Sequence, residues 1–70
     1  MKAEVEVEKL KILLEHWVEH NAEHSKNFRS WAEKARGFNL GVASDILSAA
    51  NEMDKSSEYL KAALAKLKSL

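Results

Sequence analysis

Apolar positions recur along almost the entire chain at alternating steps of four and three residues. This spacing places side chains along one side of an α-helix and is typical of helices packed lengthwise. In the first half the series is Ala3, Val7, Leu10, Leu14, Trp17, Asn21, His24, Phe28, Trp31 and Ala35. In the second half it is Ile46, Ala50, Met53, Ser57, Leu60, Leu64 and Leu67. The pattern therefore predicts two long amphipathic helices.

The segment GFNLG, at 37–41, holds both glycines of the chain and is its only turn signal. Gly37 is expected to close the first helix in the left-handed conformation, with Phe38 folding back as an apolar contact. Asn39 is a good N-cap for the next helix. We therefore predict a single all-α domain over 1–70, an antiparallel two-helix hairpin. The expected elements are a helix over about 4–36, a turn over 37–40 and a helix over about 41–68.

One stretch of the second helix, MDKSSE at 53–58, is weakly helix-forming. A break at this stretch would divide the chain into three helices. The apolar series stays in phase through Ser57, which favours one continuous helix.

The apolar surface of each helix is wider than one series of positions. The additional apolar residues are Val5, Ile12, Leu13, Leu47, Ala49, Ala63 and Ala65. Because two helices cannot bury arcs this wide, we expect a homodimer that forms a four-helix bundle. Trp17, Phe28 and Trp31 are the expected core anchors. The alternative is docking on a different protein, or on another domain of a longer chain.

The length and composition of the chain also favour a partner. A domain of 70 residues rarely obtains more than about 3–5 kcal/mol from its own core, and usually needs a disulfide, a metal or a second chain. The sequence has no cysteine, so a disulfide is excluded. A metal ion or self-association is therefore expected.

The charge balance excludes several function classes. Eleven basic and eleven acidic residues give no net charge, so neither nucleic acid nor an anionic membrane is an expected partner. The apolar runs are far shorter than the roughly 20 residues of a membrane span, and no signal peptide is recognisable, so we expect a cytoplasmic protein. Without a nucleophilic cysteine, a phosphate-binding loop or a concave pocket, an enzyme is not expected.

The three histidines of the chain, His16, His20 and His24, all lie on the first helix at intervals of four residues. Imidazoles at this spacing stand one above the other and can hold one metal ion between them. A span of eight residues covers about 12 Å, and metal–nitrogen bonds measure only about 2.0–2.1 Å, so one ion cannot bind all three. We expect His20 and His24 to be the primary ligands, and His16 an alternative or second-site ligand.

A complete site needs ligands from outside this pair. Counting back from the turn, Asp54 and Glu58 of the second helix are the best candidates for a third ligand or for a hydrogen-bond acceptor of an imidazole. A second copy of the chain could serve in the same way. Nitrogen-rich ligation suits Ni²⁺, Zn²⁺ or Cu²⁺, and the sequence does not choose among them.

A structural role for the histidines is the main alternative. Histidines along a helix seam are often ordinary polar residues that form hydrogen bonds between helices, and Asn21 could fix the helix register in the same way. A third hypothesis is a pH-responsive assembly that loosens when His24 is protonated.

The stretch LLEHWVEHNAEHSKNFRSWAEKA, at 13–35, resembles a small helical family of anaerobic bacteria and archaea with a HWxEHNxEH signature. The matching positions are His16, Trp17, Glu19, His20, Asn21, Glu23, His24, Phe28, Trp31, Ala32 and Ala35. Segments of this family occur alone or behind CooT-type nickel-binding domains linked to carbon monoxide dehydrogenase maturation. The resemblance implies a place in the handling of nickel or another transition metal. Together with the histidine pair, it makes a non-enzymatic metal-binding protein the leading expectation. The 70 residues themselves contain no CooT-type domain.

Overall fold

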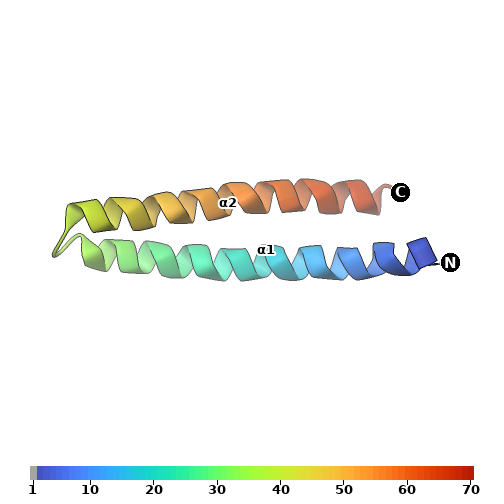
Figure 1. Cartoon of the computed structure of the whole chain (residues 1–70), viewed down its shortest axis with the longest axis horizontal. Helices are drawn as coiled ribbons and strands as arrows, with labels where there is room; N and C mark the ends of the chain where they lie inside the picture. Colours follow the sequence, from blue (N-terminus) through green and yellow to red (C-terminus); the bar gives the residue numbers. More distant parts are fainter. Residues whose placement is uncertain (1) are drawn as a thin grey trace.

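The computed structural model describes residues 2–70, which form two α-helices and no strand. The helices are α1 (Lys2–Ala35) and α2 (Leu40–Lys68). They lie side by side and antiparallel, with both termini at the same end (Figure 1). The hairpin measures 56 × 14 × 13 Å. The predicted all-α hairpin is therefore confirmed, and α2 continues without a break through 53–58.

α2 contacts α1 through the series of positions that the sequence predicts. The residues of α2 that are buried or half-buried are Ala43, Ile46, Ala50, Met53, Ser57, Leu60, Leu64 and Leu67. All but the first belong to the predicted apolar series. Three of these residues, Ala43, Ala50 and Ser57, recur every seven positions and have small side chains, so α1 can approach α2 closely along this line.

α1 contacts α2 through a face that is turned away from the predicted one. We call this face the first seam; it consists of Val7, Lys11, Leu14, Val18, Asn21, Ser25, Phe28, Ala32 and Ala35, none of which is exposed. It shares every second position with the predicted series. Leu10, Trp17 and Trp31 of that series are exposed instead, so the expectation that Trp17 and Trp31 anchor the core is wrong for the hairpin.

The size of the side chains explains this rotation of α1. Ser25, Ala32 and Ala35 are buried. The antiparallel register brings Ala32 beside Ala43 of α2, and Ser25 beside Asp54. A helix pair this close has no room for an indole between its backbones. Within residues 2–70 no large side chain is fully buried, so the hairpin alone has a thin core.

The connection between the helices differs from the expected left-handed closure. Gly37 does not have a positive φ, and Phe38 is exposed rather than folded back. The last turn of α1 tightens instead: the Gly37 N–H donates to the Lys34 carbonyl at 3.1 Å, and the Asn39 N–H donates to the Ala35 carbonyl at 2.8 Å. These bonds satisfy free carbonyls of the helix end without a left-handed residue.

Asn39 begins α2 as the sequence predicts. Its backbone is extended, with φ −161° and ψ 111°, and its side-chain oxygen accepts a hydrogen bond from the Val42 N–H at 3.0 Å. The cap satisfies one of the free N–H groups at the start of a helix and fixes the direction in which α2 leaves the turn.

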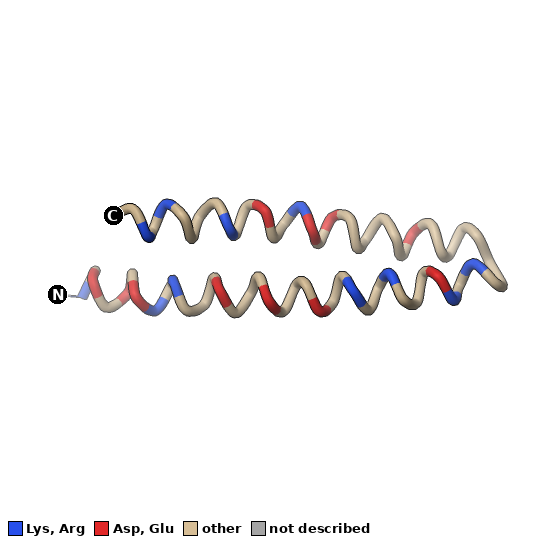
Figure 2. Tube along the Cα trace, turned by 180° about the vertical axis from the view of Figure 1, so that it is seen from behind, with Lys and Arg blue, Asp and Glu red and all other residues tan. Residues whose placement is uncertain are grey.

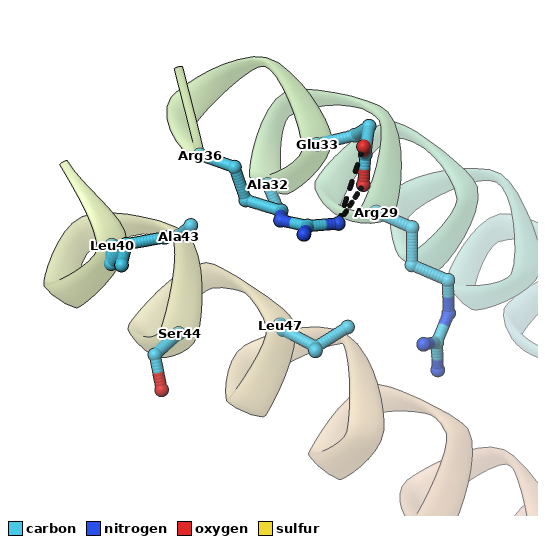
Figure 3. A pocket seen from close by; sticks show the side chains of 8 residues that line it. All are labelled: Arg29, Ala32, Glu33, Arg36, Leu40, Ala43, Ser44 and Leu47. Atoms are coloured by element: carbon cyan, nitrogen blue, oxygen red, sulfur yellow. Dashed lines mark hydrogen bonds and ion pairs between the residues drawn. The ribbon is translucent and has the colours of Figure 1, made fainter. Parts of the chain in front are cut away.

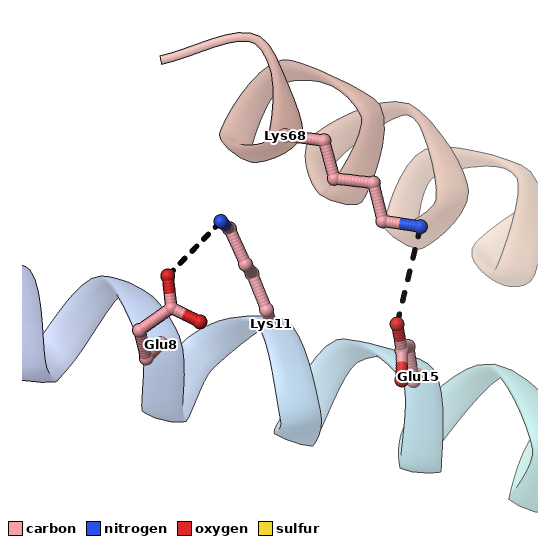
Figure 4. A network of polar contacts seen from close by, with 4 residues as sticks. All are labelled: Glu8, Lys11, Glu15 and Lys68. Carbon is pink, nitrogen blue, oxygen red and sulfur yellow. Dashed lines mark hydrogen bonds and ion pairs between the residues drawn. The ribbon is translucent and has the colours of Figure 1, made fainter.

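Two ion pairs join the helices along one long side of the hairpin. The Arg29 guanidinium donates to the Asp54 carboxylate at 2.5 Å and to the Asn51 side-chain oxygen at 3.0 Å. Nearer the termini, the Lys68 ammonium lies 3.9 Å from the Glu15 carboxylate (Figure 4). The Cα trace shows charged residues spread along α1 and along the second half of α2, whereas the start of α2 is almost uncharged (Figure 2). The two pairs set the antiparallel register on this side.

Candidate metal site on α1

His20 and His24 come together on the surface of α1. Their Nε2 atoms lie 3.1 Å apart, and the two rings meet edge to face at an interplanar angle of 88°. The helix itself produces this approach, because side chains four residues apart stand on adjacent turns of the same face. The structure therefore brings together the two histidines that the sequence predicts as primary ligands.

Two interpretations fit a distance of 3.1 Å between imidazole nitrogens. Two nitrogens that bind one ion at about 2.0–2.1 Å lie roughly 2.9–3.4 Å apart, for bond angles between square and tetrahedral. Equally, one protonated ring nitrogen can donate a hydrogen bond to the unprotonated nitrogen of the other ring. The pair is thus shaped for a shared ion or for a mutual hydrogen bond.

His16 stands one turn further along α1. Its ring stacks on that of His20, with centroids 5.9 Å apart and planes inclined by only 16°. In a stacked arrangement the ring nitrogens do not converge as those of His20 and His24 do. His16 therefore adjoins the pair as a packing neighbour.

The rings of the pair differ in their exposure. His24 is half-buried, with the Phe28 ring 6.1 Å away between centroids, whereas His20 is exposed. Phe28 belongs to the first seam, so the pair lies at the edge of the contact between α1 and α2 and opens toward solvent. A ligand or a second protein could approach it from that side.

Asp54 does not join the pair. It lies on the side of the hairpin where Arg29 and Asn51 meet, and Arg29 binds its carboxylate. The Ser25 hydroxyl and the Arg29 guanidinium hold the pKa of Asp54 below its usual range, because both stabilise the ionised carboxylate. Its charge is therefore engaged in holding the helices together.

Glu58 also stays apart from the histidines. Its carboxylate lies 3.6 Å from the ammonium of Lys61, one helical turn further along α2. It also lines a shallow depression with Asp54 and Val18. Within residues 2–70, no group of three or more His, Asp or Glu side chains is arranged to hold a metal ion. The structure thus gathers two of the five candidate residues and leaves the carboxylates elsewhere.

Sequence reasoning missed Arg29, which decides the position of Asp54. A signal for it existed: once the register is known, Arg29 and Asp54 occupy flanking positions directly across the hairpin, as oppositely charged residues often do beside a helix seam. Asp54 was assigned to the histidines by counting back from the turn, which gives its height along the hairpin but not its side. The structure places it beside Arg29 instead.

The pair belongs to a second line of residues on α1 with helix-packing spacing. We call this line the second seam; its members are Leu10, Leu13, Trp17, His20, His24, Asn27, Trp31 and Lys34. The steps alternate between three and four, as in the first seam. Trp31 is 60% exposed and Trp17 is 40% exposed, whereas His24 is half-buried, so α2 leaves most of this line uncovered.

A groove near the turn is a further concave feature. Apolar side chains of Leu40 and Leu47 face α1 there, and Arg36 lies along its rim, paired with Glu33 at 3.2 Å (Figure 3). The groove contains no histidine and no buried polar group without a partner. It offers no arrangement for catalysis or metal binding.

Neither described helix has an apolar stretch long enough to cross a membrane. Among curated proteins, the chain is 38% identical over 58 residues to a protein of Archaeoglobus fulgidus described as an uncharacterized protein. The match covers 83% of this chain and 94% of that protein. No solved structure matches the chain. Residues 10–67, which include both histidines of the pair and most of each helix, match a domain of unknown function, DUF8180, and the chain belongs to that family.

Proposed function

We propose that the protein is a non-enzymatic binder of a transition-metal ion, Ni²⁺ or Zn²⁺, through His20 and His24. The observation that carries this proposal is the 3.1 Å distance between their Nε2 atoms, which suits two ligands of one ion. Neutral imidazole nitrogen is a good ligand for Ni²⁺, Zn²⁺ and Cu²⁺ alike. His16 is a ligand of secondary importance, because its ring stacks beside the pair.

The surroundings of the pair support binding rather than catalysis. A metal enzyme needs a water or substrate position on the ion inside a shaped cavity. His20 is exposed on a single helix, and the hairpin is only 14 Å across its second dimension. By its resemblance to segments found behind nickel-binding domains, we assign the protein to the cytoplasm as an accessory in nickel handling.

We also propose that two hairpins associate into a four-helix bundle. The exposed aromatic residues Trp17 and Trp31 on one side of α1 favour this, as do the exposed Val42 and Leu47 on α2.

A structural or protein-interaction module is the second candidate function. It is favoured by the same exposed aromatic side chains, together with a hydrogen bond between His20 and His24 in place of a metal. In this case the histidines contribute shape and polarity to a docking surface, and the protein binds no metal.

Isothermal titration calorimetry with Ni²⁺ and Zn²⁺, on protein without a histidine tag, separates the two candidates. The wild type should bind with a dissociation constant of about 1 μM or tighter, and His20→Ala/His24→Ala should lose binding. His16→Ala is the matched control and should retain most of the affinity. Equally small heats for the wild type and the double variant would contradict metal binding and favour the interaction module.

A further inference from the structure

We propose that a second copy of the chain completes the metal site, so that His20 and His24 of two chains bind a single ion. This inference rests on the proposed metal function and adds the source of the missing ligands. Zinc and similar ions take at least four ligands in protein sites, and one chain brings two histidines together. Since no further His, Asp or Glu joins them within residues 2–70, the remaining ligands must come from elsewhere.

The accessible surface of the hairpin indicates that a partner of similar size is missing. The chain exposes 5435 Å². A compact monomer of 7.9 kDa exposes about 4400 Å² by the usual scaling of surface with mass. The surplus of about 1000 Å² is close to the roughly 800 Å² that each partner loses in an interface of ordinary size. One copy of the same chain is enough to remove it.

The second seam shows where this copy docks. Leu10, Leu13, Trp17 and Trp31 along it are all exposed, between 38% and 60%. Their three-and-four spacing is that of a helix-packing line, and it contains the histidine pair at its middle. An α-helix packed along this line would therefore cover the aromatic side chains and the histidines together.

A second α1, running antiparallel, fits the second seam residue by residue. A two-fold axis midway between His20 and His24 places His20 of one chain beside His24 of the other. The same axis places Leu13 beside Trp31 of the second copy, and Trp17 beside Asn27. Large side chains thus face smaller ones, and antiparallel α1 helices also align their dipoles favourably.

The position of the histidines along α1 favours the same axis. The axis crosses α1 near residue 22, and α1 extends over Lys2–Ala35. Because the axis is close to the middle of the helix, the two copies of α1 overlap over most of their length. The four imidazoles then surround the axis, and the dimer holds one ion between its two halves.

Sedimentation equilibrium combined with metal analysis of the same sample tests this inference. With ZnCl₂ or NiCl₂ alone as the probe, the wild type should sediment as two chains that contain one ion. Trp31→Gln removes a large contact of the second seam but leaves the first seam and both histidines intact. This variant should dissociate to single chains and bind the ion at least tenfold more weakly.

Tyr59→Gln is the matched control, since Tyr59 is 80% exposed and lies outside both seams. It should remain a dimer with one ion. Circular dichroism of each variant checks that the helices persist. One ion bound to each single chain would overturn the shared site and leave the proposed metal function standing. A dimer that binds two ions would also overturn it. A wild type that binds no ion at all would refute the proposed function, and the shared site with it.

Discussion

α1 carries two lines of residues with the same helix-packing spacing, and their side chains differ in size. The first seam contains Leu14, Ser25 and Ala32, which are buried against α2. The second seam contains Trp17, Trp31 and the histidine pair, and all of these except the half-buried His24 are exposed. The small side chains allow a close approach of two helices within one chain. The bulky side chains suit a wider contact, such as that between two hairpins.

The two seams also differ in their polar contacts. Beside the first seam, two ion pairs join α1 to α2: Arg29 with Asp54, and Glu15 with Lys68. On the second seam, Lys34 lies over the Trp31 ring at 4.2 Å, and the two histidines contact each other. In the part of the chain that the structure describes, the polar groups of the second seam thus contact one another and make no ion pair with α2.

The largest effect should come from placing a charge on the buried face of α2 that packs against the first seam. Ala50 has no exposed surface, so Ala50→Glu buries a carboxylate without a partner. We expect a loss of about 3 kcal/mol or more in the free energy of unfolding, enough to unfold a chain of this size. Chemical denaturation followed by circular dichroism measures it. Ala62→Glu, on the exposed side of α2, should change stability little, and an equal loss in both variants would contradict the assigned seam.

Introducing opposite charges on the second seam should weaken the dimer to an intermediate extent. The pair of substitutions also tests the antiparallel pairing of the two copies. Leu13→Glu and Trp31→Lys should each weaken the dimer at least tenfold, which corresponds to about 1.4 kcal/mol. Combining them restores an attractive contact between residue 13 of one copy and residue 31 of the other. Sedimentation velocity would show the double variant recovering part of the dimer. A double variant weaker than either single one would exclude the antiparallel axis.

Removing the charge of Asp54 should have the smallest effect, because Arg29 and Asp54 are both about half-exposed. The pKa of Asp54 is lowered in the fold, so its contribution to stability is present above the unfolded pKa of about 3.9 and disappears as the pH falls through the folded value. Asp54→Asn should therefore lower the melting temperature slightly at pH 7, and the difference should shrink as the pH falls below the ordinary pKa of an aspartate.

This difference should also shrink in high salt. Glu52→Gln is the control, because Glu52 pairs with Lys55 within α2 and makes no contact between helices. An effect of Asp54→Asn that grows as the pH falls would contradict the role given to the carboxylate.

The sequence was sufficient to predict the hairpin, the face of α2 and the Asn39 cap. On α2 a single line of positions has helix-packing spacing, so hydrophobicity identified the buried face. On α1 the predicted series ran between two such lines. It took alternate members from the first seam, such as Leu14, and from the second seam, such as Trp17 and Trp31. The choice between them depends on the small residues of α2, such as Ala43 and Ala50, which no pattern within α1 reveals.

Only the local part of the histidine site could be predicted from the sequence. The approach of His20 and His24 is a local property of the helix, so their spacing predicted it. The assignment of Asp54 rested on its distance from the turn, which does not tell on which side of the hairpin a flanking residue lies, and Asp54 pairs with Arg29 instead. Likewise, hydrogen bonds in the last turn of α1 replaced the left-handed closure expected of Gly37.

Native mass spectrometry of the protein with Zn²⁺ tests the central claim most directly, because it counts chains and ions in the same particle. We predict a species of two chains and one ion, which His20→Ala/His24→Ala should lose. Single chains that each carry an ion, or dimers that carry none or two, would contradict the account.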